Sequence, residues 1–242
     1  MANGARAGGR GGFTLIELMI VVALIAVIST MAVPKLLSSR QVANESAAIS
    51  TLRTLSTAQA QLQASSAIDC DSDGAGEFGY FGELAGAVGL REDDGSQAAQ
   101  VGSEALDPAI LATALGFVDG SAVRRSGYIF QMFLPDASGI GTPEAAGGGM
   151  GNSIDPDLAE VFWCCYAWPM DAGSSGNRAF FLNQEGDILQ FNNQSGAYGG
   201  AGAGPDWSAA FSPGSDDLGD DPSNGALGIP GNDGNLWTSL QL

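Results

Sequence analysis

Carboxylates at alternate positions precede a glycine within residues 69–74, which read Asp69-Cys70-Asp71-Ser72-Asp73-Gly74. Alternating carboxylates followed by a glycine that permits a sharp turn form the first half of a calcium-binding loop. Glu77 could add an oxygen, directly or through water, but Tyr80 stands where such a loop carries its bidentate glutamate. The segment therefore predicts either a calcium site or a solvated acidic turn. The candidate calcium ligands are Asp69, Asp71, Asp73 and Glu77.

The three cysteines, Cys70, Cys164 and Cys165, offer either a disulfide or a metal site. In an oxidising compartment, Cys70 could bridge to one of the adjacent pair. Adjacent residues of a strand point to opposite faces, so only one of the pair can face Cys70. The odd count leaves one thiol free or paired between chains, and zinc held by three thiolates is the weaker alternative.

The overall charge argues against several other functions. The chain has 242 residues, 27 of them acidic and nine basic, with a formal net charge of −18 and no histidine. So few cations cannot neutralise many phosphates, and direct binding of nucleic acid is not expected. The lack of histidine removes the commonest general base and metal ligand. The sole lysine, Lys35, is not part of a phosphate-binding loop, so no enzyme is predicted.

An almost wholly apolar run covers residues 13–33 and contains one carboxylate, Glu17. A bilayer core of about 30 Å takes about 20 helical residues, so this run is long enough to cross it. The run is too long for the apolar core of a cleaved secretory signal. A carboxylate in hydrocarbon costs roughly 2.5–3.5 kcal/mol even on the lenient insertion scale. Glu17 therefore indicates either a function or a side chain that reaches back to the membrane surface.

The stretch GFTLIELMIVV, from Gly12 to Val22, resembles the class III signal of type IV pilins and of the pseudopilins of type II secretion. The resemblance implies that prepilin peptidase cuts between Gly12 and Phe13 and methylates the new N-terminus, while the apolar helix is retained. It also implies that Glu17 pairs with the N-terminal amine of a neighbouring subunit, because a buried carboxylate is tolerable beside a cation. Pro34 lies where many pilins have a proline that kinks the helix.

The same resemblance implies four parts of the chain. They are a leader peptide at 1–12, a transmembrane and assembly helix at 13–34, an amphipathic helical half at 35–66, and an extracytoplasmic head at 67–242. The implied partners are prepilin peptidase, copies of this chain, other pilins or pseudopilins, and the inner-membrane assembly platform. The chain would be a single-pass protein of the inner membrane before it joins a filament in the periplasm or at the cell surface. Basic residues flank the apolar run on both sides, so the orientation rests on the peptidase signal and not on charge.

The second helical half is predicted from an apolar stripe. Ile49, Leu52, Leu55 and Leu62, with Ala48 and Ala58 between them, follow helical spacing, and no glycine or proline interrupts residues 35–66. Residues 82–125 are expected to be loops and short helices, with the best helix candidate at 108–117.

Strand signals cluster later in the chain, at 127–135, 160–170 and 178–193, and the last segment contains a turn at 183–186. We therefore predict an α+β, pilin-like fold, in which a long N-terminal helix packs on a small antiparallel sheet with long Gly-rich loops. Trp163 and Trp168 are expected in the core. Some major pseudopilins hold calcium in a C-terminal loop, and the acidic tail at 212–237 could offer one.

Three functions fit these patterns: a structural pilin or pseudopilin, a minor or adhesive tip subunit, and a membrane-anchored ectodomain that uses the same signal. We favour the structural subunit, because the signal motif and the uninterrupted helix both fit it.

Overall fold

The computed structural model describes residues 12–95 and 99–240. The expected leader peptide, apart from Gly12, lies outside the described residues. The chain divides into two compact units, Met1–Arg40 and Gln41–Leu242. The first unit, where described, consists mainly of the start of helix α1, which runs over Leu15–Ser65. The second unit contains the rest of α1 and all other elements, and we refer to it as the head.

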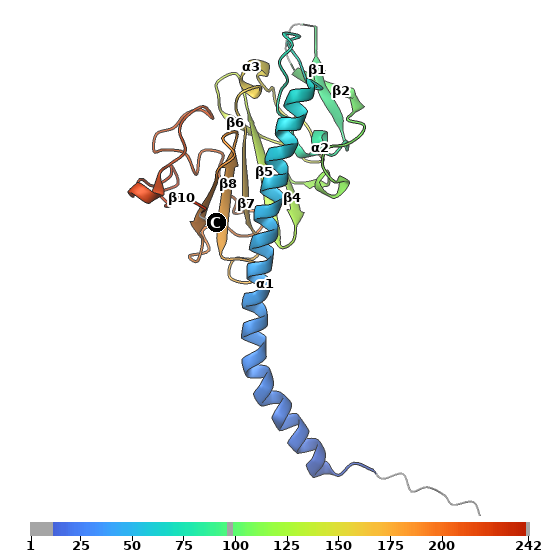
Figure 1. Cartoon of the computed structure of the whole chain (residues 1–242), viewed down its shortest axis with the longest axis vertical. Coiled ribbons are helices and arrows are strands. Elements are labelled where there is room, and N and C mark those ends of the chain that lie inside the picture. The colour runs from blue at the N-terminus through green and yellow to red at the C-terminus, as the bar shows by residue number, and fades with distance from the viewer. Residues whose placement is uncertain (1–11, 96–98, 241–242) are drawn as a thin grey trace, which may run out of the picture. The chain divides into compact units, whose positions relative to one another are not determined.

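The part of α1 that lies in the head buries the predicted stripe. Leu52, Leu55 and Leu62 are fully buried with Ala48 and Ala58, and Ile49 is half-buried against the same core. The stripe also contains two buried polar residues that apolar periodicity does not reveal, Glu45 and Gln59. Figure 1 shows this part of the helix lying across the strands of the head.

The main sheet has the strand order β10-β9-β8-β7-β5-β4-β3, with β6 paired to β5, and every pairing is antiparallel. Its central strands are β5 (Tyr128–Pro135), β7 (Cys164–Pro169), β8 (Arg178–Asn183) and β9 (Ile188–Asn192). They confirm the four predicted strands, and the α+β fold class is confirmed with them. The turn between β8 and β9 is as predicted, since the Gly186 N–H donates to the Asn183 carbonyl at 3.1 Å.

Short strands complete this sheet at both edges. They are β3 (Val118–Asp119), β4 (Ala122–Arg125), β6 (Gly141–Pro143) and β10 (Thr238–Ser239).

The expectation of loops and short helices for residues 82–125 is largely wrong. A separate hairpin pairs β1 (Gly89–Asp93) with β2 (Ala99–Ala105), and β3 and β4 also lie in this stretch. The helix expected at 108–117 is reduced to the 3-10 turn η1 (Thr113–Leu115). Five of the seven residues of β2 are exposed, so the strand lacks the alternation that reveals a half-buried strand.

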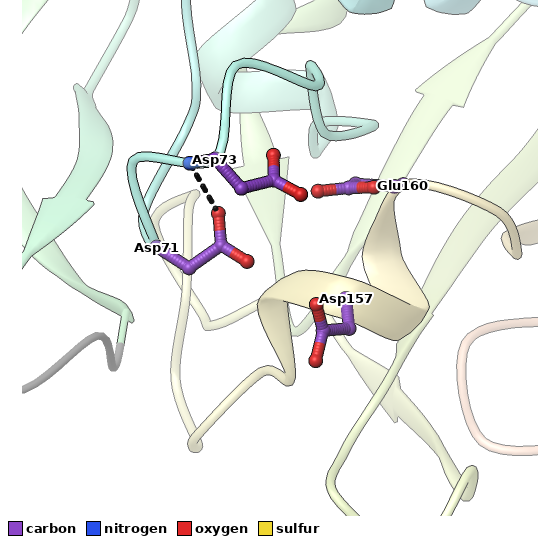
Figure 2. Close-up of side chains that lie close together, drawn as sticks. All are labelled: Asp71, Asp73, Asp157 and Glu160. Atoms are coloured by element: carbon purple, nitrogen blue, oxygen red, sulfur yellow. Dashed lines mark hydrogen bonds between the residues drawn. The ribbon is translucent and has the colours of Figure 1, made fainter.

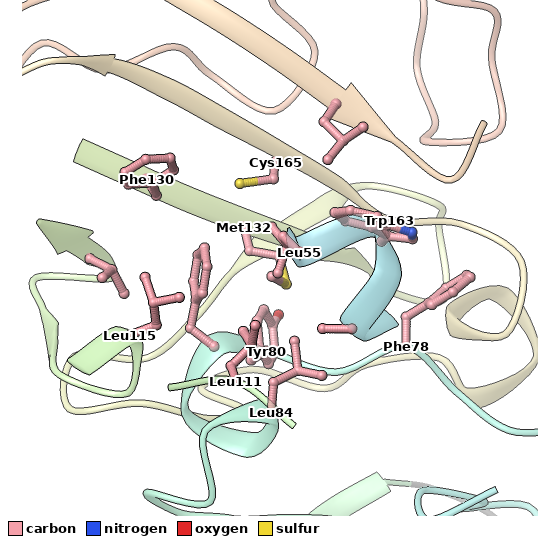
Figure 3. Packing of buried hydrophobic residues seen from close by; sticks show 14 of the residues in the cluster. Leu55, Phe78, Tyr80, Leu84, Leu111, Leu115, Phe130, Met132, Trp163 and Cys165 are labelled. Atoms are coloured by element: carbon pink, nitrogen blue, oxygen red, sulfur yellow. The ribbon is translucent and has the colours of Figure 1, made fainter. Parts of the chain in front are cut away.

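Two hydrophobic clusters cover the opposite faces of the main sheet. Successive residues of β7 alternate between them, with Cys165 in the cluster that contains the α1 stripe and Cys164 in the other. Figure 3 shows the helix-side cluster, in which Leu55 and Trp163 lie near Met132 and Cys165 of the sheet. The second cluster is closed by the C-terminal segment, which contributes Phe211, Leu218 and Trp237. As expected, Trp163 and Trp168 are core residues.

The remaining short helices are α2 (Phe81–Leu84), α3 (Pro156–Ala159) and the 3-10 turn η2 (Gly225–Leu227).

Candidate functional site

The start of α1 presents apolar side chains on all sides. All residues from 12 to 40 are exposed, and those between Leu15 and Val33 are almost all hydrophobic. By length and composition, α1 is the one helix among the described residues that could cross a membrane. An apolar helix with no covering surface of its own requires lipid or other protein chains around it.

Glu17 caps its own helix. Its Oε2 accepts the Thr14 N–H at 2.9 Å and the Thr14 hydroxyl at 2.7 Å, while the Glu17 N–H donates to Thr14 Oγ1 at 3.2 Å. This arrangement is a capping box, which satisfies backbone donors that the first turn of a helix leaves without partners. The Thr-x-x-Glu spacing of Thr14 and Glu17 was visible in the sequence, so this role could have been found there. Among the described residues, no hydrogen bond reaches the other carboxylate oxygen, Oε1.

Pro34 lies inside α1, and the helical assignment continues through it. A proline at this place removes one backbone hydrogen bond of the helix. The predicted kink stays a prediction.

A buried ion pair fastens α1 to the sheet of the head. Glu45 is 6% exposed and accepts hydrogen bonds from the Asn177 N–H at 2.9 Å and from Arg178 Nε at 2.8 Å. Arg178 Nη2 also lies 2.8 Å from the same carboxylate. Pairing and hydrogen bonding make burial of Glu45 tolerable, so this contact fixes the position of the helix along β8.

Four carboxylates gather at one side of the head. Asp71 and Asp73 come from the loop after α1, and Asp157 and Glu160 come from α3 and its end. One carboxylate oxygen from each of the four lies within 4.8 Å of the others. Figure 2 shows the four side chains. Oxygen ligands at such spacing suit a hard cation such as calcium. Calcium binding stays a prediction.

The structure brings two of the four expected calcium ligands into this group. Asp71 and Asp73 belong to the group, but Asp69 instead accepts the Gly74 N–H within the loop at 3.2 Å. Glu77 is fully buried, where its Oε1 accepts the Cys70 N–H at 2.7 Å. Its Oε2 lies 3.5 Å from the guanidinium of Arg91, so the Glu77 carboxylate is held inside the protein. No nearby signal could have indicated Asp157 and Glu160, because they lie far along the chain.

The pKa values of two members of the acidic group are raised, that of Asp71, mainly by desolvation, and that of Glu160. The pKa of Glu160 is raised to about 7, first by desolvation and then by the negative charges of Asp73, Asp71 and Asp157. A cation bound here would relieve this repulsion.

Arg91 of β1 forms a second ionic cluster inside the head. Its guanidinium lies between the carboxylates of Glu77, at 3.5 Å, and Glu83 of α2, at 3.1 Å, and none of these side chains is exposed. It also donates to the Phe78 carbonyl and lies over the ring of Tyr80. Burial disfavours the charge of Arg91, but Glu83 and Glu77 outweigh it and raise the pKa of the guanidinium. This cluster joins the loop after α1, helix α2 and the β1–β2 hairpin.

All three cysteines are free and buried thiols. The predicted bridge from Cys70 to one of the adjacent pair is therefore not formed in the structure. Cys165 belongs to the same hydrophobic cluster as Cys70, whereas Cys164 belongs to the cluster on the other face of the sheet. Burial raises the pKa of each thiol, which makes all three unreactive.

Comparisons with known proteins agree with the site at the N-terminus. Residues 8–33 match the family described as "Prokaryotic N-terminal methylation motif". The chain is 29% identical over 174 residues to the type IV major pilin protein PilA of Myxococcus xanthus, an alignment that covers 69% of this chain and 73% of the relative. No solved structure matches the chain. Pilins are structural subunits and not enzymes. With the methylation motif at its start, a membrane-length helix behind the motif and a similarity to a major pilin, the chain resembles the type IV pilins.

Proposed function

We propose that this chain is the major structural subunit of a type IV pilus. Prepilin peptidase removes residues 1–12 and methylates Phe13, and the chain then assembles through the apolar start of α1. The observation that carries the proposal is the fully exposed apolar helix that directly follows the methylation motif. Lipid covers this surface before assembly, and copies of the same helix cover it in the filament. The similarity to a protein named as a major pilin favours a pilus over a secretion pseudopilus.

Glu17 has two roles in this proposal, and the geometry separates them. Its Oε2 caps the helix through Thr14. Its Oε1 accepts the N-terminal amine of an incoming subunit, which places a cation beside a carboxylate that hydrocarbon would otherwise leave unpaired. The pairing also selects the axial register between neighbouring subunits, as buried charges do in coiled coils.

Three variants of the full chain test these roles in the native cell. Glu17→Gln keeps an oxygen that can cap the helix but removes the charge, and Thr14→Val removes the cap but keeps the charge. We expect Glu17→Gln to be processed normally and to accumulate in the membrane without forming filaments, whereas Thr14→Val still assembles. Glu104→Gln, on the exposed strand β2, is the matched control and should assemble like the wild type. Normal filaments from Glu17→Gln would refute the pairing.

Intact mass and N-terminal peptide analysis of the native protein test the processing. The expected chain begins at Phe13 and carries one added methyl group. A chain that begins near Met1 would refute the proposal and favour a membrane-anchored ectodomain. The abundance of the protein in sheared surface filaments distinguishes a major subunit from the alternative, a minor or adhesive tip subunit, because a major subunit is present in large excess.

A further inference from the structure

The C-terminal part of the head contains a hollow of about 480 Å³ that the pilin function does not use. Its volume lies in the range of roughly 300–1,000 Å³ that is usual for small-molecule sites. Three buried apolar side chains line it, Phe181 of β8, Leu189 of β9 and Trp237 just before β10. All of its lining residues belong to the head.

Two buried polar side chains in the lining each contain one atom that has no hydrogen-bond partner. Asn183, at the end of β8, is 1% exposed, and Ser223 is 4% exposed. The unpartnered atoms are Asn183 Nδ2 and Ser223 Oγ. The Asn183 oxygen already accepts the Glu185 N–H at 3.2 Å, which identifies its nitrogen as the unused donor. Buried donors without partners are rare in native proteins and call for an explanation.

Asn183 lies on the hollow side of the sheet. Residues of a strand alternate between faces, and Phe181, two positions earlier, belongs to the cluster on the tail side. Asn183 also pairs in register with Cys164, another member of that cluster. Both arguments place the unused amide on the side where the hollow lies.

Carboxylates surround the entrance, at Glu185, Asp187 and Asp221, all of which are exposed. No lysine or arginine is among the described residues that line the hollow. This rim repels phosphates and carboxylates and accepts hydrogen bonds from ligand O–H or N–H groups.

We propose that the hollow binds a neutral sugar residue. The unused Asn183 amide needs an acceptor, which an ammonium group does not have. A hydroxyl both accepts and donates, so a sugar can satisfy Asn183 and Ser223 and still donate to the carboxylates of the rim. The C–H face of the sugar ring can cover the apolar side chains of the lining. The proposal rests on the head alone and is independent of whether the chain assembles into a pilus.

Saturation-transfer NMR on the full chain in dodecylphosphocholine micelles tests this proposal, because that detergent has no sugar headgroup. The probes are D-glucose, N-acetyl-D-glucosamine and methyl α-D-mannoside, compared with n-butylammonium and methyl phosphate, whose methyl protons report saturation. We expect transfer to at least one sugar and none to methyl phosphate. Ser223→Ala and Asp221→Asn should each weaken the binding of that sugar about fivefold to tenfold, the factor expected for one hydrogen bond.

Matched substitutions away from the hollow, Ser103→Ala and Glu104→Gln on exposed β2, should leave the affinity unchanged. Ser223→Ala removes no hydrogen bond of the Ser223 side chain, and Asp221 is exposed, so both variants should melt like the wild type. The proposal is overturned if none of the three sugars receives saturation or if only n-butylammonium does. It is also overturned if both Ser223→Ala and Asp221→Asn bind the sugar with wild-type affinity.

Discussion

Replacing Arg91 by methionine should destabilise the head strongly and in a pH-dependent manner. Arg91 is 2% exposed and is the cation between two fully buried carboxylates, those of Glu77 and Glu83. Methionine fills much of the same volume but removes the charge. The two carboxylates then remain in the interior without their cation.

The expected loss is about 3–5 kcal/mol at pH 7.5, because breaking a buried ion pair leaves an uncompensated charge in the core. For a unit of this size, such a loss corresponds to roughly 6–20 °C in melting temperature. Burial raises the pKa of Glu83 even beside Arg91, and loss of this cation raises it further. Above the ordinary pKa of 4.5, the folded variant then binds more protons than the unfolded chain, so its stability falls as pH rises from 4.5 through the folded pKa of Glu83.

Thermal and urea unfolding of the head, residues 41–242, at pH 5.0 and pH 7.5 measures both effects. Arg124→Met is the matched control, because Arg124 pairs with Asp119 at 2.9 Å on the surface, where the two side chains are 42% and 73% exposed. Exposed pairs contribute about 0–1 kcal/mol. The triple variant Arg91→Met, Glu77→Gln, Glu83→Gln should recover part of the loss at pH 7.5. The reasoning is refuted if Arg91→Met costs no more than Arg124→Met, or if its deficit is the same at both pH values.

Three further outcomes follow from the head. The pKa of Glu160 is raised to about 7 in the folded chain from an ordinary 4.5, so this group lowers the stability of the head as pH rises from 4.5 to 7. The melting temperature of Glu160→Gln should therefore equal that of the wild type near pH 4.5 and exceed it at pH 8. Equal melting temperatures at pH 8 would contradict this. Calcium at about 100 times its dissociation constant should stabilise the head by about 2.7 kcal/mol at pH 7.5. The variant Asp157→Asn should abolish that stabilisation. A wild-type melting temperature that neither calcium nor chelation changes would refute the calcium prediction. Leu55 is 1% exposed in the helix-side cluster, so Leu55→Ala should lower the free energy of unfolding in urea by about 2–5 kcal/mol. The control is Leu227→Ala, at a side chain that is 75% exposed. Similar losses of stability in both variants would contradict the packing of Leu55.

Local patterns revealed a large part of this protein. The methylation motif around Gly12 and Glu17 depends on adjacent residues, and the membrane-length run depends only on composition and length. The stripe through Leu52 and Leu55 follows helical spacing, and β5 and β7–β9 are rich in aromatic and β-branched residues. In each case the physical signal lies within one helix or one strand. The capping box of Thr14 and Glu17 was equally local.

Other features have no local signal. Strand β2 of the β1–β2 hairpin is mostly exposed, and the buried residue of β1 is the charged Arg91, so no apolar alternation reveals the hairpin. The acidic, Gly-rich tail is read from composition as a loop, yet Leu218 and Trp237 in it complete the second core cluster. The tail packs on the sheet because its apolar residues bury the apolar side chains on the face opposite α1.

The sequence by itself determined the methylation motif and the membrane-length apolar run, since both depend only on contiguous residues. Only the tertiary structure decided where the charges of the head lie. Glu77 turns inward because Arg91, from another element, offers it a buried cation, whereas Asp71 and Asp73 meet Asp157 and Glu160 of a distant segment. The unused donor of Asn183 likewise becomes visible only when Ser223 and the tail close over the sheet. The environment of a polar side chain depends on every element packed around it, and spacing along the chain does not encode that environment.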